Sequence, residues 1–262
     1  MDINKLFDVK DKVVLVTGGG RGIGLMIATG FVSAGAKVYI ASRTASVCDK
    51  VAEELSRQGP GRCISIPADL SSLDECQRLV DELSKHESHL DVLVNNSGTN
   101  YNESLEDYPN EMFEKVLNLN LTRIFSLTQK CLPLLKAKGT MENPSRIINI
   151  GSIDGLRPPP QTTFAYSASK SGLHMMTQHM ASQLGGEGIL CNAIAPGAFR
   201  SKMMKATLDA FEEVIKSQIP TGRIGTPEDI AGTCIYLSSK AGQYVTGAVL
   251  VVDGGVSSGA KL

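Results

Sequence analysis

Tyr166 and Lys170 have the residue types and the spacing of a proton-transfer site. They lie four residues apart in the sequence, so on a helix both side chains project from one face. A tyrosine with an ordinary pKa of about 10 is a poor proton donor at neutral pH. A neighbouring ammonium favours the phenolate and lowers that pKa. We therefore predict that Tyr166 is the general acid of a carbonyl reduction and that Lys170 tunes it.

Ser152 and Asn120 are two polar residues that suit the same chemistry. Ser152 follows the apolar segment Ile147–Gly151, where its hydroxyl can hydrogen-bond the substrate oxygen that Tyr166 protonates. Asn120 interrupts an otherwise apolar helical pattern, and a polar residue inside a helix usually has a partner or a function. A Tyr-x-x-x-Lys pattern alone is common. The chemistry therefore depends on the whole set of candidate catalytic residues, which is Asn120, Ser152, Tyr166 and Lys170.

A glycine-rich turn over residues 17–24 has the features of a phosphate site. It follows the apolar run 13–16 and precedes the helical pattern Leu25–Ala34. Glycines allow a tight turn and a close ligand, and the N-terminus of the following helix offers free N–H groups to a pyrophosphate. The simpler alternative is an ordinary turn. The candidate cofactor contacts here are Gly18, Arg21, Gly22, Ile23 and Gly24.

Two arginines indicate which dinucleotide is bound. Arg43 follows the second predicted strand, at the place where a dinucleotide fold meets the adenosine ribose, and residues 39–44 contain no acid. An acid there would bind the 2′-hydroxyl of NAD, whereas an arginine suits the 2′-phosphate of NADP. Arg21 offers a second positive charge. The alternative is a pair of solvated surface residues, and we predict NADP(H).

Polar residues also follow the third and fourth predicted strands. Asp69, next to Leu70, can accept from an adenine amino group or can cap the following helix. In the sequence Asn-Asn-Ser-Gly at 95–98, the Asn96 amide can fix the neighbouring backbone and Gly98 leaves room for a cofactor. A plain turn is the alternative for this segment.

Apolar strands alternate with amphipathic segments along the whole chain. We expect strands at Val13–Thr17, Val38–Ser42, Cys63–Pro67, Leu90–Asn95, Ile147–Gly151, Leu190–Ile194 and Val249–Val252. Helical patterns follow at Leu25–Ala34, Ser46–Arg57, Leu73–Lys85, Pro109–Lys136, Ala165–Leu184 and Pro227–Ser238. This alternation predicts an α/β fold, a doubly wound parallel sheet of the Rossmann type with helices on both faces. We expect one domain over 1–262, a polar loop at Lys138–Ser145 and a lid over the ligand within 197–220.

Composition narrows the class of protein further. The chain has 262 residues, 42% of them hydrophobic and 20% charged, and a net charge of −1, which argues against nucleic acid or an anionic membrane as the main partner. No apolar run approaches the length that spans a bilayer. The six cysteines form no Cys-x-x-Cys pair, and we expect buried reduced thiols. The four histidines do not cluster with carboxylates, so we expect no metal site.

These motifs together resemble the short-chain dehydrogenase/reductase family over nearly the whole chain. The resemblance implies that Ser152, Tyr166 and Lys170 are catalytic. It also implies that Asn120 holds a water linking Lys170 to solvent and that Lys170 binds the nicotinamide ribose. Tyr166, Pro196, Gly197 and Ser201 would also contact the cofactor, with Ser201 in place of the family's more usual threonine. The arginine pair resembles the NADP-preferring branch, and residues 252–255 resemble the last strand and a subunit contact, which implies a tetramer or a dimer.

Some details depart from the family pattern or point to one of its branches. Ser97 stands where alanine is more usual, and Arg157–Pro160 makes a stiff loop beside the substrate. Three features are similar to the 3-oxoacyl reductase branch of rhamnolipid-type biosynthesis. They are the length of the gap from Ser152 to Tyr166, the loop Glu142–Pro144 and the sequence of residues 147–152.

The predicted function is that of an NADPH-dependent reductase of a ketone on an acyl chain or a secondary-metabolite skeleton. One alternative is a polyol, sugar or secondary-alcohol dehydrogenase. Another is a cofactor-binding regulator without turnover, since fold does not fix function. The intact set of Ser152, Tyr166 and Lys170 argues against the regulator. His174 and His179 are interpreted as packing or subunit-contact residues.

The chain ends in Ala260-Lys261-Leu262, which resembles the Ser-Lys-Leu peroxisomal address. We predict peroxisomal import if the source is eukaryotic and a cytoplasmic enzyme otherwise. A frayed terminus is the alternative.

Overall fold

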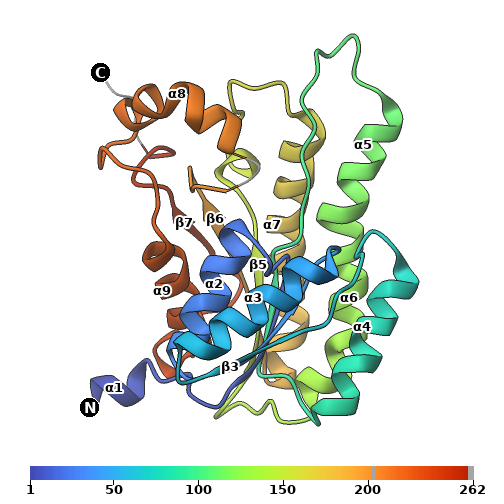
Figure 1. Ribbon diagram of the computed structural model, residues 1–262, viewed down its shortest axis with the longest axis vertical. Coiled ribbons are helices and arrows are strands. Elements are labelled where there is room, and N and C mark those ends of the chain that lie inside the picture. Colours follow the sequence, from blue (N-terminus) through green and yellow to red (C-terminus); the bar gives the residue numbers. More distant parts are fainter. Residues whose placement is uncertain (202–203, 259–262) are drawn as a thin grey trace.

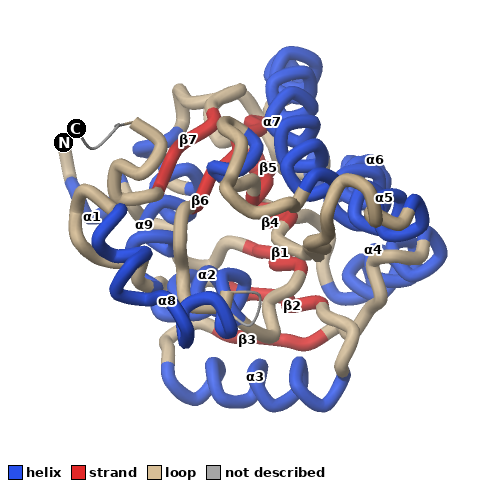
Figure 2. The backbone as a smooth tube through the Cα atoms, turned by 90° about the horizontal axis from the view of Figure 1, so that it is seen from above, coloured by secondary structure: helices blue, strands red, loops and turns tan. Residues whose placement is uncertain are grey.

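The computed structural model describes residues 1–201 and 204–258. Its core is a seven-stranded sheet in the order β3-β2-β1-β4-β5-β6-β7 (Figures 1 and 2). Every neighbouring pair of strands in this sheet is parallel. The strands are β1 Val13–Thr17, β2 Lys37–Ala41, β3 Arg62–Ser65, β4 Val92–Asn95, β5 Ser145–Ile150, β6 Ile189–Pro196 and β7 Val249–Val252. The predicted doubly wound α/β fold is confirmed.

Helices cover both faces of the sheet because successive residues of each strand point to opposite faces. Val14 and Val16 of β1 belong to one buried cluster, while Val13 and Leu15 belong to the other. The first cluster is closed by α2 Gly22–Ser33, α3 Ala45–Gln58 and α9 Pro227–Ser238. The second is closed by α4 Leu73–His86, α6 Arg123–Lys136 and α7 Phe164–Leu184 (Figure 2).

The remaining helices lie outside these two layers. The short α1 spans Ile3–Leu6, α5 spans Asn110–Leu117 and α8 spans Lys205–Gln218. Single 3₁₀ turns cover Ile153–Gly155, Gly185–Glu187 and Lys240–Gly242. None of the described helices is long and apolar enough to cross a membrane.

The strand order places a crevice between β1 and β4. The chain winds from β1 toward β3 on one side and from β4 toward β7 on the other, so the order reverses between β1 and β4. In an open parallel sheet, ligands bind at the carboxyl ends of the strands beside such a reversal. The loops that leave these ends carry Gly18, Asn96 and Ser152, so the topology gathers the predicted site residues at the carboxyl ends of the strands.

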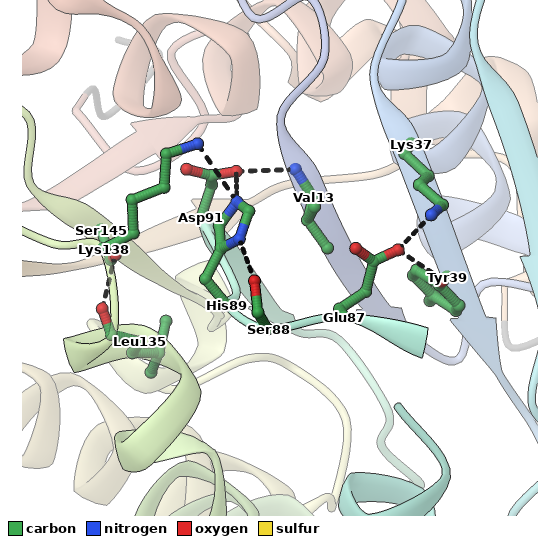
Figure 3. A network of polar contacts seen from close by, with 10 residues as sticks. All are labelled: Val13, Lys37, Tyr39, Glu87, Ser88, His89, Asp91, Leu135, Lys138 and Ser145. Atoms are coloured by element: carbon green, nitrogen blue, oxygen red, sulfur yellow. Dashed lines mark hydrogen bonds and ion pairs between the residues drawn. The ribbon is translucent and has the colours of Figure 1, made fainter. Parts of the chain in front are cut away.

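Polar residues form a network at the other end of the strands, where the strands begin (Figure 3). Buried Asp91 accepts a hydrogen bond from the Val13 N–H at 2.8 Å, and the Tyr39 hydroxyl donates to Glu87 at 2.6 Å. The Ser145 hydroxyl donates to the Leu135 carbonyl at 2.8 Å. These contacts satisfy polar groups where the strands begin, so this network holds the sheet together at the end far from the crevice.

Some predicted segments differ from the structure. The helix predicted over Pro109–Lys136 is α5 and α6 joined by a π-helical turn at Asn118–Thr122. The loop predicted over Lys138–Ser145 ends one residue early, because Ser145 and Arg146 are buried at the start of β5. The Arg146 guanidinium donates to the Leu237 carbonyl at 2.9 Å, and this hydrogen bond compensates for the burial of its charge. A sequence pattern alone would place this arginine on the surface.

Candidate active site

The structure brings Tyr166, Lys170 and Ser152 together. Ser152 follows β5, and α7 begins at Phe164, so Tyr166 and Lys170 lie in its first two turns. The Lys170 Nζ lies 5.5 Å from the centroid of the Tyr166 ring and donates to the Ile150 carbonyl at 2.7 Å. Ser152 and Lys170 are buried, with 7% and 3% of their surface exposed. The predicted common face of Tyr166 and Lys170 is therefore present.

Burial governs the protonation of this group. Desolvation raises the pKa of the Tyr166 phenol to about 12, a hydrogen bond with Ser152 opposes the shift, and the charge of Asp154 adds to it. The net shift is opposite to the one predicted from Lys170, so that part of the prediction was wrong: spacing shows the neighbour but not the loss of water. Burial also lowers the pKa of Lys170 to about 8. At neutral pH, Tyr166 retains its proton and most of Lys170 is charged.

Asn120 lies in the π-helical turn and is fully buried. Its Oδ1 accepts from the Thr99 N–H at 2.8 Å, and its Nδ2 donates to the Thr99 carbonyl at 2.9 Å and to the Ser169 hydroxyl at 3.1 Å. Both amide protons are used, so the water that the family resemblance implies would bind a carbonyl oxygen of Asn120. π-Helical turns inside helices are frequent at functional sites.

Gly98 lies in the loop after β4, next to the side chains of Asn120 and Lys170. A Cβ atom at this position would stand 3.3 Å from the Asn120 Oδ1 and 3.9 Å from the Lys170 Nζ. Gly98 therefore lies next to Lys170, where the predicted cofactor would bind.

The glycine turn after β1 is shaped so that side chains are excluded from it. Gly18 and Gly22 have positive φ values of 68° and 55°. A Cβ on Gly24 would stand 2.4 Å from the Gly18 carbonyl oxygen and 2.5 Å from the Asn96 Nδ2. Asn96 in turn donates to the Thr17 carbonyl at 2.8 Å, so β4 holds the turn from the other side of the crevice.

This turn fits a pyrophosphate. The helix α2 begins at Gly22, and no side chain caps its N-terminus. Its first N–H groups therefore remain available to an anion, as the predicted phosphate site requires. Ile23 is half-buried and packs against the core beneath the turn.

The predicted phosphate arginines lie on neighbouring loops. Thr17 and Ala41 are partners in the β1–β2 ladder, so Arg21 and Arg43 follow adjacent strand ends. The two loops touch, since a Cβ on Gly20 would lie 3.0 Å from the Ser42 hydroxyl. Both arginine side chains are exposed, and neither forms a hydrogen bond or ion pair with residues that the structure describes. Their charges are thus free to meet an anionic ligand.

Asp69 is not the cap of the next helix. Its Oδ1 accepts from the Ser71 N–H at 3.1 Å and from the Ser71 hydroxyl at 2.8 Å. The N-cap of α4 is Ser72, whose hydroxyl accepts from the Glu75 N–H at 3.4 Å. Leu70 beside it is buried. Of the two sequence interpretations of Asp69, contact with an adenine amino group is the one that remains a prediction.

Pro196, Gly197 and Ser201 begin the segment predicted as a lid. Pro196 is the last residue of β6, and the Gly197 N–H donates to the Val252 carbonyl at 3.0 Å. A Cβ on Gly197 would lie 2.8 Å from the Asp253 Cβ, so close packing against β7 already requires glycine there. The Ser201 Cβ would lie 3.1 Å from a Cβ on Gly22, which brings this segment over the glycine turn.

Much of the predicted lid is helical rather than loose, because α8 occupies Lys205–Gln218 (Figure 1). Residues 202 and 203 lie outside the described part of the chain. Closure of the segment over a ligand stays a prediction.

Sequence reasoning missed an aromatic cluster beside the site. The Tyr108 ring packs edge-on against Tyr101, Phe113 and Phe164, with centroids 5.5, 6.0 and 5.9 Å away. Phe164 is the first residue of α7, so the cluster packs at the N-terminal end of the helix that carries Tyr166. No local pattern links four aromatic residues from separate segments, and only the tertiary fold shows the cluster.

The histidines of α7 behave as packing and surface residues. His174 is buried, and a Cβ on Gly151 would lie 2.1 Å from its Nε2. Burial and the charge of Lys170 lower the pKa of His174 to about 4, so the ring is neutral. His179 is exposed. All six cysteines are free and buried, as predicted. Among the described residues, no group of three or more His, Cys, Asp or Glu side chains could hold a metal ion.

Comparison with known proteins identifies the family. A family model described as "Enoyl-(Acyl carrier protein) reductase" matches residues 18–257 of this chain. The chain belongs to the short-chain dehydrogenase/reductase family. This short-chain dehydrogenase/reductase is therefore an oxidoreductase, and the resemblance drawn from its motifs is confirmed.

Several relatives align along their whole length. The rhamnolipids biosynthesis 3-oxoacyl-[acyl-carrier-protein] reductase of Pseudomonas aeruginosa is 44% identical over 95% of this chain and 97% of its own. A solved structure of the Pseudomonas aeruginosa RhlG/NADP active-site complex has a TM-score of 0.93 at 44% identity and covers 97% of this chain and 99% of its own. The 5-keto-D-gluconate 5-reductase of Escherichia coli is 31% identical over 97% of this chain and 98% of its own.

Proposed function

We propose that this short-chain dehydrogenase/reductase uses NADPH to reduce a ketone carbonyl on a 3-oxoacyl chain or a secondary-metabolite skeleton. The observation that carries the proposal is the convergence of Ser152, Tyr166 and Lys170 in a fold whose glycine turn leaves the N-terminus of α2 without a side-chain cap. The similarity to a 3-oxoacyl-[acyl-carrier-protein] reductase and to an NADP complex supports the same choice of substrate and cofactor.

The residues fit the bound cofactor that this function requires. The turn from Gly18 to Gly24 would hold the pyrophosphate, and Arg21 and Arg43 would hold the 2′-phosphate. Lys170 would hold the nicotinamide ribose. When bound, NADPH supplies the hydride that the carbonyl carbon accepts.

The protein's own groups then manage the oxygen of the substrate. The Ser152 Oγ accepts from the Asp154 N–H at 3.1 Å and its hydroxyl is hydrogen-bonded with Tyr166, so one carbonyl oxygen could take both hydroxyl groups as donors. As the carbon gains hydride, the Tyr166 hydroxyl gives its proton to the developing alkoxide, and an alcohol results. The Lys170 ammonium stabilises the phenolate left behind. Proton return from solvent through Lys170 and a water at Asn120 completes the cycle.

A substrate panel tests this function. Purified protein with NADPH is offered a 3-oxoacyl thioester, an enoyl thioester, 5-keto-gluconate and a simple polyol with NADP⁺. We expect the fastest loss of nicotinamide absorbance with the 3-oxoacyl thioester, because the chain is 44% identical to a 3-oxoacyl-[acyl-carrier-protein] reductase. A higher kcat/KM for the keto-sugar or polyol would favour the sugar alternative. Tight NADPH binding without turnover of any compound would favour the regulator.

We also propose that the protein is a homo-oligomer, a tetramer or a dimer. β7 is an edge strand, and its residue Val251 is 44% exposed. Phe125 on α6 and Met175 on α7 expose 49% and 66% of their surface. Unpaired strand edges and exposed apolar side chains are features of subunit contacts. Light scattering at working concentration measures the assembly, and a monomer mass would contradict the proposal.

The proposed location depends on the source. Residues 260–262 lie outside the described part of the chain, so the predicted peroxisomal address rests on its sequence alone. In a eukaryotic cell, a fluorescent protein fused to the N-terminus should give puncta with a peroxisomal marker, and deletion of Ala260–Leu262 should disperse them. Diffuse signal with the tail intact would place the enzyme in the cytoplasm.

A further inference from the structure

Asp154 is an acidic residue placed within the reacting group and used by none of the steps above. It lies in the 3₁₀ turn that follows Ser152, and its N–H donates to the Ser152 hydroxyl oxygen. The next residue, Gly155, has no room for a side chain, since a Cβ would lie 2.7 Å from the Lys170 carbonyl carbon. The turn is therefore pressed against α7, which fixes Asp154 between the segments that carry Ser152 and Lys170.

The carboxylate of Asp154 is not neutralised by its neighbours. It forms no hydrogen bond or close ion pair with any residue in the described ranges. Burial raises the pKa of the Asp154 carboxyl, and the charge of Arg157 opposes that shift, although Arg157 is exposed and water screens it. The charge of Asp154 reaches Tyr166, where it raises the pKa of the phenol. A substrate carbonyl held by Tyr166 therefore lies within the field of this carboxylate.

Lys170 is the buried cation beside this group, and its ammonium is already engaged. Lys170 is buried against the Ile150 carbonyl and the Tyr166 ring. A second negative charge close to the carbonyl would thus meet the carboxylate of Asp154, and like charges in such proximity are disfavoured.

We infer that Asp154 determines substrate specificity by rejecting ketones that carry an anionic group near the carbonyl, and that the site accepts neutral or cationic ketones. This inference rests on the proposed ketone reduction and deepens it. A thioester or ester of a 3-oxo acid satisfies the rule, whereas the free 3-oxo acid does not.

The test compares matched ketones with NADPH. Methyl 3-oxobutanoate is neutral, 3-oxobutanoate is anionic, and a trimethylammonium derivative of acetone is cationic. We expect the wild type to prefer the ester over the free acid by at least about 10-fold in kcat/KM, as one close like-charge contact predicts. In Asp154→Asn the preference should shrink at least about 5-fold, mainly through faster reduction of the acid. The cationic ketone should be reduced more slowly by the variant than by the wild type.

Opposite changes for anion and cation separate a charge effect from a structural one. A loosened site would slow all three ketones together, and that result would overturn the inference, as would an unchanged ratio. Asp154→Ser serves as a second variant if the first folds poorly, and Asp74→Asn, on exposed α4, should leave every ratio as in the wild type. Wild-type reduction of ester and acid at equal rates would contradict the inference while leaving ketone reduction intact. Failure to reduce any ketone would contradict both.

Discussion

Replacing Tyr166 with phenylalanine is expected to lower kcat for ketone reduction by about 10²–10⁴-fold, the range that a positioned general acid contributes. The ring and its packing against Lys170 remain, while the proton that the alkoxide needs is lost. NADPH affinity should stay within about 3-fold of the wild type, because the lost proton transfer stabilises only the transition state and contributes nothing to binding of the cofactor. Steady-state rates and NADPH fluorescence titration measure the two quantities.

The matched control for this variant is Tyr244→Phe, since Tyr244 is fully exposed on the surface. Its kcat should equal that of the wild type. A Tyr166→Phe enzyme with near-normal kcat on the best ketone would show that another group supplies the proton.

Replacing Arg43 with alanine is expected to weaken NADPH binding by about 10- to 100-fold, because a charge-assisted hydrogen bond contributes about 1.5–3 kcal/mol. NADH has no 2′-phosphate, so its affinity should change by less than about 2-fold. The preference of the wild type for NADPH should therefore largely disappear in this variant. Titration of both nucleotides against both proteins measures the effect.

Arg57→Ala provides the matched control, since Arg57 is an exposed arginine near the end of α3 that pairs with Glu53 instead of facing the cofactor turn. Its nucleotide affinities should match the wild type. Equal wild-type affinities for NADPH and NADH, or a parallel loss of both in Arg43→Ala, would rule out the 2′-phosphate as the partner of Arg43.

Most of the sheet could be predicted from the sequence, because most strands combine a short apolar run with a following turn. The elements β1 Val13–Thr17, β7 Val249–Val252 and α9 Pro227–Ser238 have the predicted bounds. In α9 the start is fixed locally, because Thr226 and Asp229 form a capping box and a proline follows the cap. The division at Asn118–Thr122 has no such signal, since the helical pattern runs on without glycine or proline.

The parts of the candidate site that follow from residue spacing on one helix could be predicted from the sequence. The parts that depend on contacts between distant segments could not. Tyr166 and Lys170 had to share a face once they lay on one helix. The direction of the Tyr166 pKa shift depends on burial by segments far away in the sequence, and the prediction from a neighbouring charge failed there. The aromatic cluster around Tyr108 and the pressed turn that holds Asp154 also depend on distant contacts, which a linear pattern does not contain.

Transfer of deuterium from labelled NADPH tests the central claim most directly. The protein is given the best ketone of the panel with NADPH carrying deuterium at nicotinamide C4 in either configuration, and the product is analysed by mass spectrometry and NMR. The proposed hydride transfer predicts one deuterium at the carbinol carbon from one of the two labelled forms and none from the other, with one NADPH consumed per alcohol formed. An alcohol without label from either form, or no product while NADPH stays bound and intact, would contradict it.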